Sequence, residues 1–269
     1  MKTLIVVPAR YASQRLPGKP LALIAGRSMV SRVAGLARRA AAGLPQAEYV
    51  VATDDTRILE HCRDAGIPVV MTDPALPSGS DRALAAAEGL GAEPEFIVNL
   101  QGDAPFTPAA HVTAIVEALA ASGTDAATPY IRLSWEALDR LRAHKQETPF
   151  SGTTVVTDPG GRAIWFSKII LPAMRKEAEL RKLGPLSPVF QHIGLYAYRL
   201  GALRRYCALP ESRYERLEGL EQLRILENGM TMQAVEVQPG RIAIPGIDTA
   251  EDIALAERLV AEHGDPDAG

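Results

Sequence analysis

Three cations lie close together in the segment PARYASQRLPGKP, residues 8–20. The segment directly follows a short apolar run at residues 3–7, which is typical of a buried strand. Arg10, Arg15 and Lys19, with Gly18 between them, could bring positive charge and main-chain N–H groups around a polyphosphate. A solvated basic loop would explain any one of these cations. Three of them at the end of one strand favour phosphate binding.

Two common phosphate-binding patterns do not fit this loop. A dinucleotide fold requires G-x-G-x-x-G, and a P-loop requires G-x-x-x-x-G-K followed by Ser or Thr. In this chain Gly18 and Lys19 are followed by Pro20, and no glycine lies five positions before Gly18. A dehydrogenase and a P-loop kinase therefore lose their main support.

Two acidic residues occur where a ligand crevice is expected. Asp103 comes directly after VNLQG at residues 98–102, and Asp248 lies between the run at residues 244–247 and the last predicted helix. Ligands of open α/β sheets bind beyond the carboxyl ends of the strands, and Mg²⁺ is held there by one or two carboxylates plus phosphate oxygens. Both acids are therefore candidate Mg²⁺ ligands. The alternative for each is that it only caps a helix.

The first half of the chain alternates between two kinds of segment. Short β-branched runs predict strands at residues 3–7, 48–52, 68–71 and 96–100, and stretches with helical spacing predict helices at residues 28–42, 56–65, 81–91 and 108–121. This order is typical of βαβ units, and nearly continuous apolar strands suit a sheet covered on both faces. We therefore predict an α/β fold with a doubly wound, mostly parallel sheet.

From about residue 125 the pattern changes. Strands are predicted at residues 128–131, 153–156, 162–166, 192–198 and 233–237, and helices at 218–228 and 249–263, with a charged surface segment at 172–188. Long connections containing Pro and Gly separate these strands, which predicts a smaller mixed-sheet lobe. We expect one domain over residues 1–269, with a core at 1–125, a lobe at 126–200 and a closing segment at 201–269.

Composition limits the possible partners and compartment. The 269 residues are 47% hydrophobic and 23% charged with a net charge of −3, which is ordinary for a globular protein and lacks the basic excess of a nucleic-acid binder. No apolar stretch is long enough for a signal-peptide core or a membrane span. Cys62 and Cys207 lack a C-x-x-C spacing. We expect a cytoplasmic protein that binds neither nucleic acid nor membranes and has no disulfide or zinc site.

The chain resembles a known family in seven blocks that follow one another in the same order. They are VVPARYASQRLPGKPLALIAGRSM, VVATDDTRI, VVMTDPALPSGSDR, VNLQGDAPF, QHIGLYAYR, LEGLEQLRILENGM and GIDTAEDI. These blocks cover nearly the whole chain and are highly specific for the 3-deoxy-manno-octulosonate cytidylyltransferases, or CMP-Kdo synthetases, among the nucleotide-sugar nucleotidyltransferases. The resemblance implies transfer of CMP from CTP to an acidic 2-keto-3-deoxy sugar, for bacterial surface polysaccharides such as lipopolysaccharide.

The resemblance also implies roles for single residues, with Mg²⁺ as cofactor and a homodimer as the assembly. The residues that match the triphosphate loop and the metal-binding carboxylates, and so the catalytic set, are Arg15, Lys19, Asp103 and Asp248. The residues that match substrate-binding positions on the nucleotide side are Arg10, Thr53, Asp54, Ser78, Ser80, Arg82 and Gln101. Those that match the sugar side are Lys168, His192, Tyr196, Glu221 and Gln222. The core would bind the nucleotide, and the lobe would bind the sugar and form the dimer.

Three departures from the family pattern fall on the sugar side. Ala104 stands where Glu is usual after QGD, Lys168 where Arg is usual, and SGTTVV at residues 151–156 where an Asn-Pro-Asn segment is expected. Lysine cannot offer a carboxylate the bidentate fork of arginine. We therefore expect an octulosonate or a close variant with an altered substituent. A transferase for another acidic sugar such as a sialic acid, one that uses another nucleotide, and a non-catalytic sugar-nucleotide sensor are the alternatives.

Overall fold

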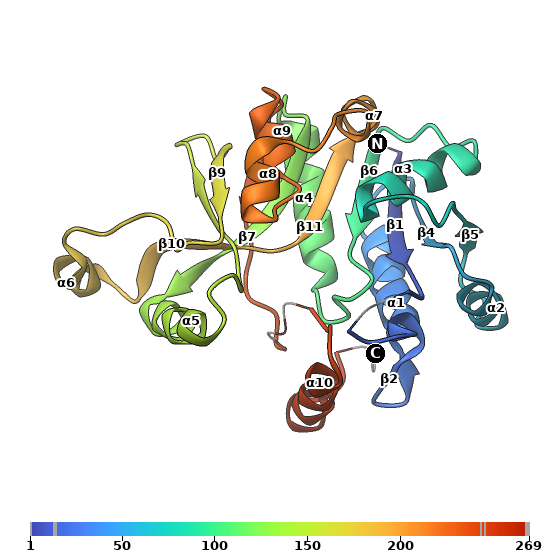
Figure 1. Ribbon diagram of the computed structural model, residues 1–269, viewed down its shortest axis with the longest axis horizontal. Coiled ribbons are helices and arrows are strands. Elements are labelled where there is room, and N and C mark those ends of the chain that lie inside the picture. The colour runs from blue at the N-terminus through green and yellow to red at the C-terminus, as the bar shows by residue number, and fades with distance from the viewer. Residues whose placement is uncertain (1, 13–14, 243, 245, 267–269) are drawn as a thin grey trace.

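One ten-stranded sheet runs through the computed structural model, which describes residues 2–12, 15–242, 244 and 246–266 (Figure 1). The strand order is β5-β4-β1-β6-β11-β7-β10-β8-β9, and β12 lies beside β7. A separate hairpin is formed by β2 (Leu23–Ile24) and β3 (Arg27–Ser28). Among the described residues, no helix has the length and apolar character needed to cross a lipid bilayer.

The first half of the sheet is parallel. Its strands are β1 (Thr3–Ala9), β4 (Ala47–Thr53), β5 (Val69–Met71) and β6 (Phe96–Leu100), and its helices are α1 (Met29–Ala42), α2 (Thr56–Asp64), α3 (Gly79–Gly89) and α4 (Ala109–Ala121). β1 pairs in parallel with β4 and β6, and β4 with β5. The predicted doubly wound arrangement is confirmed. The predicted bounds agree with the observed ones to within two residues at each end.

The second half continues the same sheet with mostly antiparallel pairs. Its strands are β7 (Ala126–Ser134), β8 (Thr154–Thr157), β9 (Ala163–Ser167), β10 (Leu186–His192), β11 (Leu195–Arg199) and β12 (Met232–Glu236). β11 joins the two halves because it pairs with β6 on one side and with β7 on the other. The mixed part was predicted, but its strands extend the parallel half of the sheet and form no second sheet of their own.

Two predicted elements were wrong because each is divided. The strand predicted at residues 192–198 is the end of β10 and the start of β11, with a turn at Ile193 and Gly194. The helix predicted at residues 218–228 starts at the last residue of α8 (Arg213–Glu218), crosses a turn and continues as α9 (Leu223–Glu227). The rest of α8 lies before the predicted range and was not predicted. Gly219 ends α8 with a φ of 64°, a left-handed conformation that interrupts the helix and that glycine adopts readily.

Two longer helices were also not predicted, α5 (Trp135–Glu147) and α7 (Leu200–Cys207). Ser134 caps α5 by accepting a hydrogen bond from the Ala137 N–H at 3.1 Å. The predicted surface segment at residues 172–188 contains α6 (Glu177–Leu180) and the 3-10 turn η2 (Arg181–Leu183). In Figure 1, α5 and α6 form the left-hand end of the molecule.

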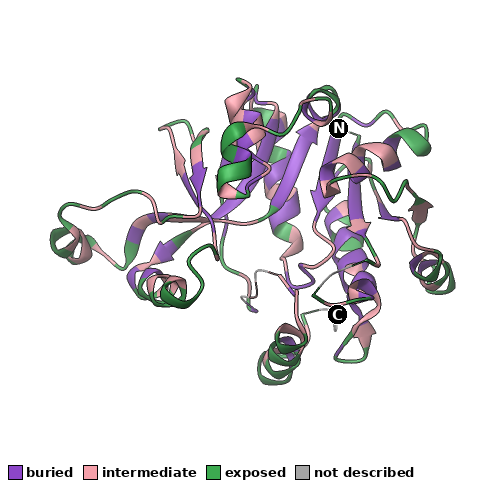
Figure 2. Ribbon diagram, in the orientation of Figure 1, coloured by how far each residue is buried: buried purple, intermediate pink, exposed green. Residues whose placement is uncertain are grey.

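The core has two layers, one on each face of the sheet. Alternate residues of β1 point to opposite faces, so Leu4 and Val6 pack with α3 and α7, whereas Ile5 and Val7 pack with α1 and α4. Figure 2 shows the central strands buried and the outer faces of the helices exposed. A smaller apolar cluster packs α10 (Ala250–His263) against the hairpin β2–β3, and this places the start of α10 near the loop that follows β1.

Candidate active site

All four predicted catalytic residues meet near the carboxyl ends of β1 and β6. The Lys19 Nζ donates to Asp103 Oδ2 at 2.9 Å and to Asp248 Oδ1 at 3.0 Å. The Arg15 guanidinium lies 3.1 Å from Asp248 Oδ2. Gly18, with a φ of 71°, turns the chain just before Lys19. Segments from the two ends of the chain therefore build one cluster of two cations and two carboxylates.

Main-chain contacts bring the two acids together. A Cβ at residue 102 would lie 2.1 Å from the Pro8 carbonyl oxygen, so only glycine lets the loop after β6 pass so close to β1. One residue later, the Asp103 carbonyl accepts a hydrogen bond from the Ile247 N–H at 2.9 Å. This bond places Asp248 beside Asp103.

Neither Asp103 nor Asp248 is the N-cap residue of the helix that follows it, so the alternative that each acid only caps a helix is excluded. Pro108 is the N-cap residue of α4, and Thr249 is the N-cap of α10, where it forms a capping box with Asp252. The Asp248 N–H donates to Asp252 Oδ2 at 2.9 Å, which leaves the Asp248 carboxylate to face Lys19 and Arg15.

The electrostatics of this cluster keep Lys19 charged. Burial lowers the pKa of Lys19, but the charges and hydrogen bonds of Asp103 and Asp248 outweigh it and raise the pKa above the ordinary value. Two carboxylates that both lie about 3 Å from one ammonium nitrogen are close enough to share a small cation, and oxygen atoms are the ligands that Mg²⁺ prefers. No group of three or more His, Cys, Asp or Glu among the described residues could hold a metal, so a cation here would take its other ligands from a substrate or from water.

A second charged group lies at the ends of β1 and β4. Ala9 pairs with Thr53 across these strands, so the next residues, Arg10 and Asp54, are neighbours. Asp54 Oδ2 lies 2.9 Å from an Nη of Arg82 and 3.5 Å from Nε of Arg10. The Arg10 side chain is 47% exposed, which leaves it available to a nucleotide.

Three other predicted nucleotide-side residues are completely buried. Thr53, Ser80 and Arg82 are each 0% exposed. The Ser80 hydroxyl accepts a hydrogen bond from Asn99 at 3.2 Å and lies 3.3 Å from the Tyr198 hydroxyl. These side chains contact protein groups in this structure and support the loops around the crevice.

The remaining two nucleotide-side residues lie at element ends. Ser78 is the N-cap residue of α3 and accepts a hydrogen bond from the Asp81 N–H at 3.2 Å. Gln101 follows β6, and its carbonyl accepts from the Ala104 N–H at 3.2 Å to form a turn. Ser78 therefore begins a helix, and Gln101 lies at the carboxyl end of β6.

A cavity of about 380 Å³, called here the sugar-side cavity, contains four of the five predicted sugar-side residues. They are His192, Tyr196, Glu221 and Gln222. Because Leu195 pairs with Leu100, the turn before β11 lies at the same edge of the sheet as Gln101 and Asp103. Part of the cavity lining, including Gly194, therefore lies at the same end of the sheet as the charged cluster.

The polar groups of the cavity include a donor without a partner. The Tyr196 hydroxyl donates to Gln222 Oε1 at 3.1 Å, and Gln222 is only 2% exposed. Gln222 Nε2 has no hydrogen-bond partner among the described residues. A buried amide N–H without a partner costs free energy, which a ligand hydroxyl or carboxylate in the cavity would recover.

Burial sets the charge of the titratable groups in the cavity. It lowers the pKa of His192 to about 3, with a smaller contribution from Lys168, so this imidazole is neutral near pH 7. Its Nε2 lies 2.8 Å from the Thr128 hydroxyl. Burial raises the pKa of Glu221 to about 6, where it is poised to gain or lose a proton near neutral pH.

Lys168 lies beside the cavity and is not among the residues that line it. It follows β9 and is half-buried, and burial lowers its pKa, which Glu218 partly offsets. Its ammonium makes no ion pair or hydrogen bond within the part of the chain that the structure describes. It is therefore a cation available to an anionic ligand.

The three departures from the family pattern have different positions. Ser151, Gly152 and Thr153 of the SGTTVV segment line the sugar-side cavity. Ala104 is buried in the turn after Gln101 and does not line it. Lys145 and Glu218, which were not predicted as site residues, bind the main chain of Lys168. The signal for Lys145 was the cap Ser134 followed by Leu138 and Leu141 at helical spacing.

Comparison with known proteins shows the family of this chain. The cytidylyltransferase family model matches residues 4–232. Two proteins named 3-deoxy-manno-octulosonate cytidylyltransferase are similar over most of their length. That of Maricaulis maris is 41% identical, over 98% of this chain and 99% of its own, and that of Alkalilimnicola ehrlichii is 40% identical, over 97% of both.

Two solved structures extend the comparison. A CMP:2-keto-3-deoxy-manno-octonic acid synthetase complexed with CTP superposes with a TM-score of 0.83 at 31% identity, over 97% of this chain and 99% of that one. A cytidylyltransferase from Leptospira borgpetersenii shares the fold, with a TM-score of 0.57 at 18% identity over 97% of this chain and 87% of that one. The chain belongs to the 3-deoxy-manno-octulosonate cytidylyltransferases of the cytidylyltransferase family.

Proposed function

We propose that the protein transfers CMP from CTP to 3-deoxy-manno-octulosonate or a close variant, releases pyrophosphate, and thereby serves bacterial surface polysaccharide synthesis. The observation that carries the proposal is the cluster of Lys19, Arg15, Asp103 and Asp248 at the same sheet edge as a polar cavity. A polyphosphate site next to a hydroxyl-binding cavity suits the joining of a nucleotide to a sugar. The names of the relatives and the CTP complex of the structural neighbour support it.

The reaction is a substitution at the α-phosphate of CTP. The anomeric hydroxyl of the sugar loses its proton to solvent and forms a new bond to the α-phosphorus. The bond between the α-phosphorus and the oxygen that bridges to the β-phosphate breaks, and pyrophosphate leaves with the negative charge. Arg15 and Lys19 offset that charge. In the ligand-free protein Arg15 and Lys19 form ion pairs with carboxylates. A bound triphosphate, which carries more negative charge, would replace these carboxylates as the partner of both cations.

We also propose that Asp103 and Asp248 hold Mg²⁺ together with phosphate oxygens. The proximity of the two carboxylates supports this, as does their position next to the proposed triphosphate loop. When bound, Mg²⁺ would offset charge on the phosphates and lower the pKa of the attacking hydroxyl.

On the sugar side, Lys168 would bind the carboxylate of the substrate. Its ammonium is a point charge and gives the carboxylate less orientation than a guanidinium does. The cavity wall at residues 151–153 also differs from the family pattern. These two features favour an octulosonate with an altered substituent as the close variant.

The assembly and compartment are part of the same proposal. The lobe that contains α5 and α6 exposes large apolar side chains, with Phe150 78%, Ile169 69% and Leu183 82% exposed. Burial of such side chains against a second copy would stabilise a homodimer. A reaction that consumes CTP fits the cytoplasm, where nucleotides are made.

Pyrophosphate release tests the proposal. The wild-type protein with Mg²⁺ is assayed with CTP, UTP, GTP or TTP, and with an octulosonate, an amino-substituted octulosonate or N-acetylneuraminate. We expect turnover with CTP and an octulosonate. A preference for N-acetylneuraminate or another nucleotide would overturn the substrate assignment, and binding without turnover would indicate a sensor.

A further inference from the structure

Main-chain oxygens surround the ammonium of Lys145, in the last turn of α5. Its Nζ donates to the carbonyl of Lys168 at 2.7 Å, to that of Gly152 at 3.1 Å and, at shorter range, to that of Ser151. The Pro149 carbonyl lies at 3.4 Å. An ammonium has three N–H donors, so these carbonyls occupy all of them. Within the described residues, Lys145 makes no ion pair with a carboxylate.

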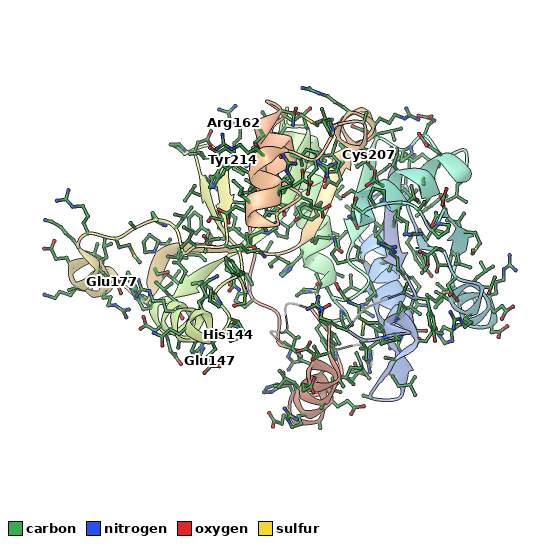
Figure 3. The ribbon with its side chains drawn as sticks, in the orientation of Figure 1. His144, Glu147, Arg162, Glu177, Cys207 and Tyr214 are labelled. Carbon is green, nitrogen blue, oxygen red and sulfur yellow. The ribbon has the colours of Figure 1, made fainter. Side chains whose placement is uncertain are left out.

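The carbonyls that Lys145 binds belong to two different segments. Ser151 and Gly152 form one wall of the sugar-side cavity, together with Leu141 and His144 of α5. Figure 3 labels His144, which directly precedes Lys145. The third carbonyl belongs to Lys168, at the end of β9. One side chain therefore joins the 151–152 wall to the main chain of the proposed carboxylate-binding residue.

Lys168 is also held from its other side. Its N–H donates to Glu218 Oε2 at 2.8 Å, and the Ser167 hydroxyl donates to Glu218 Oε1 at 2.8 Å. Glu218 directly precedes Gly219, which lines the cavity. The N–H and the C=O of Lys168 are thus both hydrogen-bonded. Its Cα, which carries the side chain, is therefore fixed relative to the 151–152 wall and to Glu218.

We propose that Lys145 is a positioning residue for the acidic sugar, which sets where Lys168 presents its charge and where the 151–152 wall lies. The inference rests on the proposed function, because it concerns how this site selects its sugar. A lysine side chain is long and rotatable and provides a charge without the directional fork of arginine. A fixed main chain restores part of the orientation that the side chain lacks, and catalytic geometry tolerates little displacement.

The test is Lys145→Met, which keeps the length of the side chain and removes its charge and donors. Hydrogen bonds from charged groups are strong, so we expect the KM for the octulosonate to rise about ten- to a hundredfold. The KM for CTP, bound at the other end of the crevice, should change less than about twofold. Lys176→Met is the matched control, since Lys176 is 74% exposed and pairs only with Glu179 among the described residues.

Amide hydrogen exchange gives a readout that needs no substrate. Peptides that cover residues 148–153 and 167–171 should exchange faster in Lys145→Met than in the wild type, and the control should leave them unchanged. Should Lys145→Met fail to fold, Glu218→Ala removes both acceptors from the opposite side of the Lys168 peptide and should raise the same KM.

The outcomes separate this inference from the proposed function. Absence of turnover by the wild type with every sugar would overturn the proposed function and, with it, the role of Lys145. Normal wild-type turnover with an unchanged sugar KM in Lys145→Met, or with equal rises in both KM values, would overturn this inference alone.

Discussion

Lys19 contacts both acids of the charged cluster. Because the cluster has two cations and two carboxylates, its charges balance. Asp103 and Asp248 lie 2.9 and 3.0 Å from its ammonium, and Arg15 lies 3.1 Å from Asp248. Such an arrangement holds the carboxylates in place without a bound ligand. It also means that a ligand must exchange partners with the cluster, because a triphosphate attracts the cations and a divalent metal attracts the acids.

We expect Asp103→Asn and Asp248→Asn each to lower kcat by a factor of about 100 or more. Either change removes a proposed Mg²⁺ ligand and with it several kcal/mol of charge stabilisation in the transition state. The fold should persist, because asparagine keeps the shape and neither acid caps a helix. Turnover at saturating Mg²⁺, together with the thermal midpoint, checks this. Near-normal kcat in either variant would remove that residue from the metal site.

The second prediction at this scale concerns Glu221, whose pKa burial raises to about 6. As the pH falls below about 6, the carboxylate gains a proton and accepts fewer hydrogen bonds from sugar hydroxyls. We therefore expect kcat/KM for the sugar to fall below about pH 6 in the wild type and to fall less in Glu221→Gln. His192, with a pKa of about 3, stays neutral over this range and adds no inflection.

The phosphates of CTP also titrate near pH 6, so the wild type and Glu221→Gln are compared with the same CTP. Their titration affects both proteins equally, so the difference between the profiles reports Glu221. The contribution of Glu221 to the free energy of unfolding changes with pH in the opposite direction to the activity. A carboxyl whose pKa is raised on folding stabilises the fold fully below its unfolded pKa of about 4.5, and this contribution is lost as the pH rises through about 6. An identical inflection in both proteins would show that another group titrates.

At the scale of elements, the helices and strands that have a clear local pattern of apolar residues were predicted from the sequence. The parallel strands and their helices were found because buried apolar runs and helical spacing alternate cleanly up to residue 121. The break between α8 and α9 was hidden, because Leu and Glu keep a helical spacing through Gly219. The main-chain carbonyls that bind Lys145 could not be predicted, because every residue has a carbonyl oxygen and the sequence does not show which ones a side chain will contact. The candidate site was located through motifs and the family resemblance, and its contacts came from the fold.

The turn at Gly219 gives a prediction at this scale. Gly219 has a φ of 64°, and a Cβ there would meet no atom within 4 Å, so any effect of alanine comes from the backbone. We expect Gly219→Ala to lower the free energy of unfolding by about 1–2 kcal/mol, the cost of a left-handed conformation for an L-residue. Gly201→Ala is the control, since Gly201 lies in α7 without a positive φ and alanine favours helix there.

Urea unfolding of both variants measures the difference. Because Gly219 also lines the sugar-side cavity, the KM for the sugar should rise in Gly219→Ala and stay constant in Gly201→Ala. Equal stability of the two variants would show that the turn adapts without strain.

At the scale of the whole molecule, the site depends on contacts between segments that are distant in sequence. Asp248 comes just before α10, and Lys19 comes just before the hairpin β2–β3, which packs against α10. In Figure 1 this helix and hairpin lie side by side at the lower end of the molecule. The relative position of the two catalytic residues therefore depends on how α10 is held.

One buried cation joins these parts. The Arg32 side chain of α1 is 0% exposed and donates to the Ile24 carbonyl from Nε at 2.9 Å and from Nη2 at 2.7 Å. It also donates to both carboxylate oxygens of Asp265, at 2.9 and 3.0 Å. Asp265 follows α10, and Ile24 lies in β2. Arg32 thus connects α1, the hairpin and the chain beyond α10.

We expect Asp265→Ala to lower the free energy of unfolding by about 3 kcal/mol, because it removes a carboxylate that forms two hydrogen bonds with a buried guanidinium. This value is at the lower end for a buried pair, since the Asp265 side chain is 20% exposed. Loosening of α10 should also shift Asp248 and raise the KM for CTP. Glu136→Ala, which breaks an exposed pair with Arg140, should cost no more than about 1 kcal/mol and leave that KM unchanged. Urea unfolding and CTP kinetics of both variants decide the matter. If Asp265→Ala loses stability while the KM for CTP is unchanged, Arg32 holds the fold together without positioning the catalytic pair.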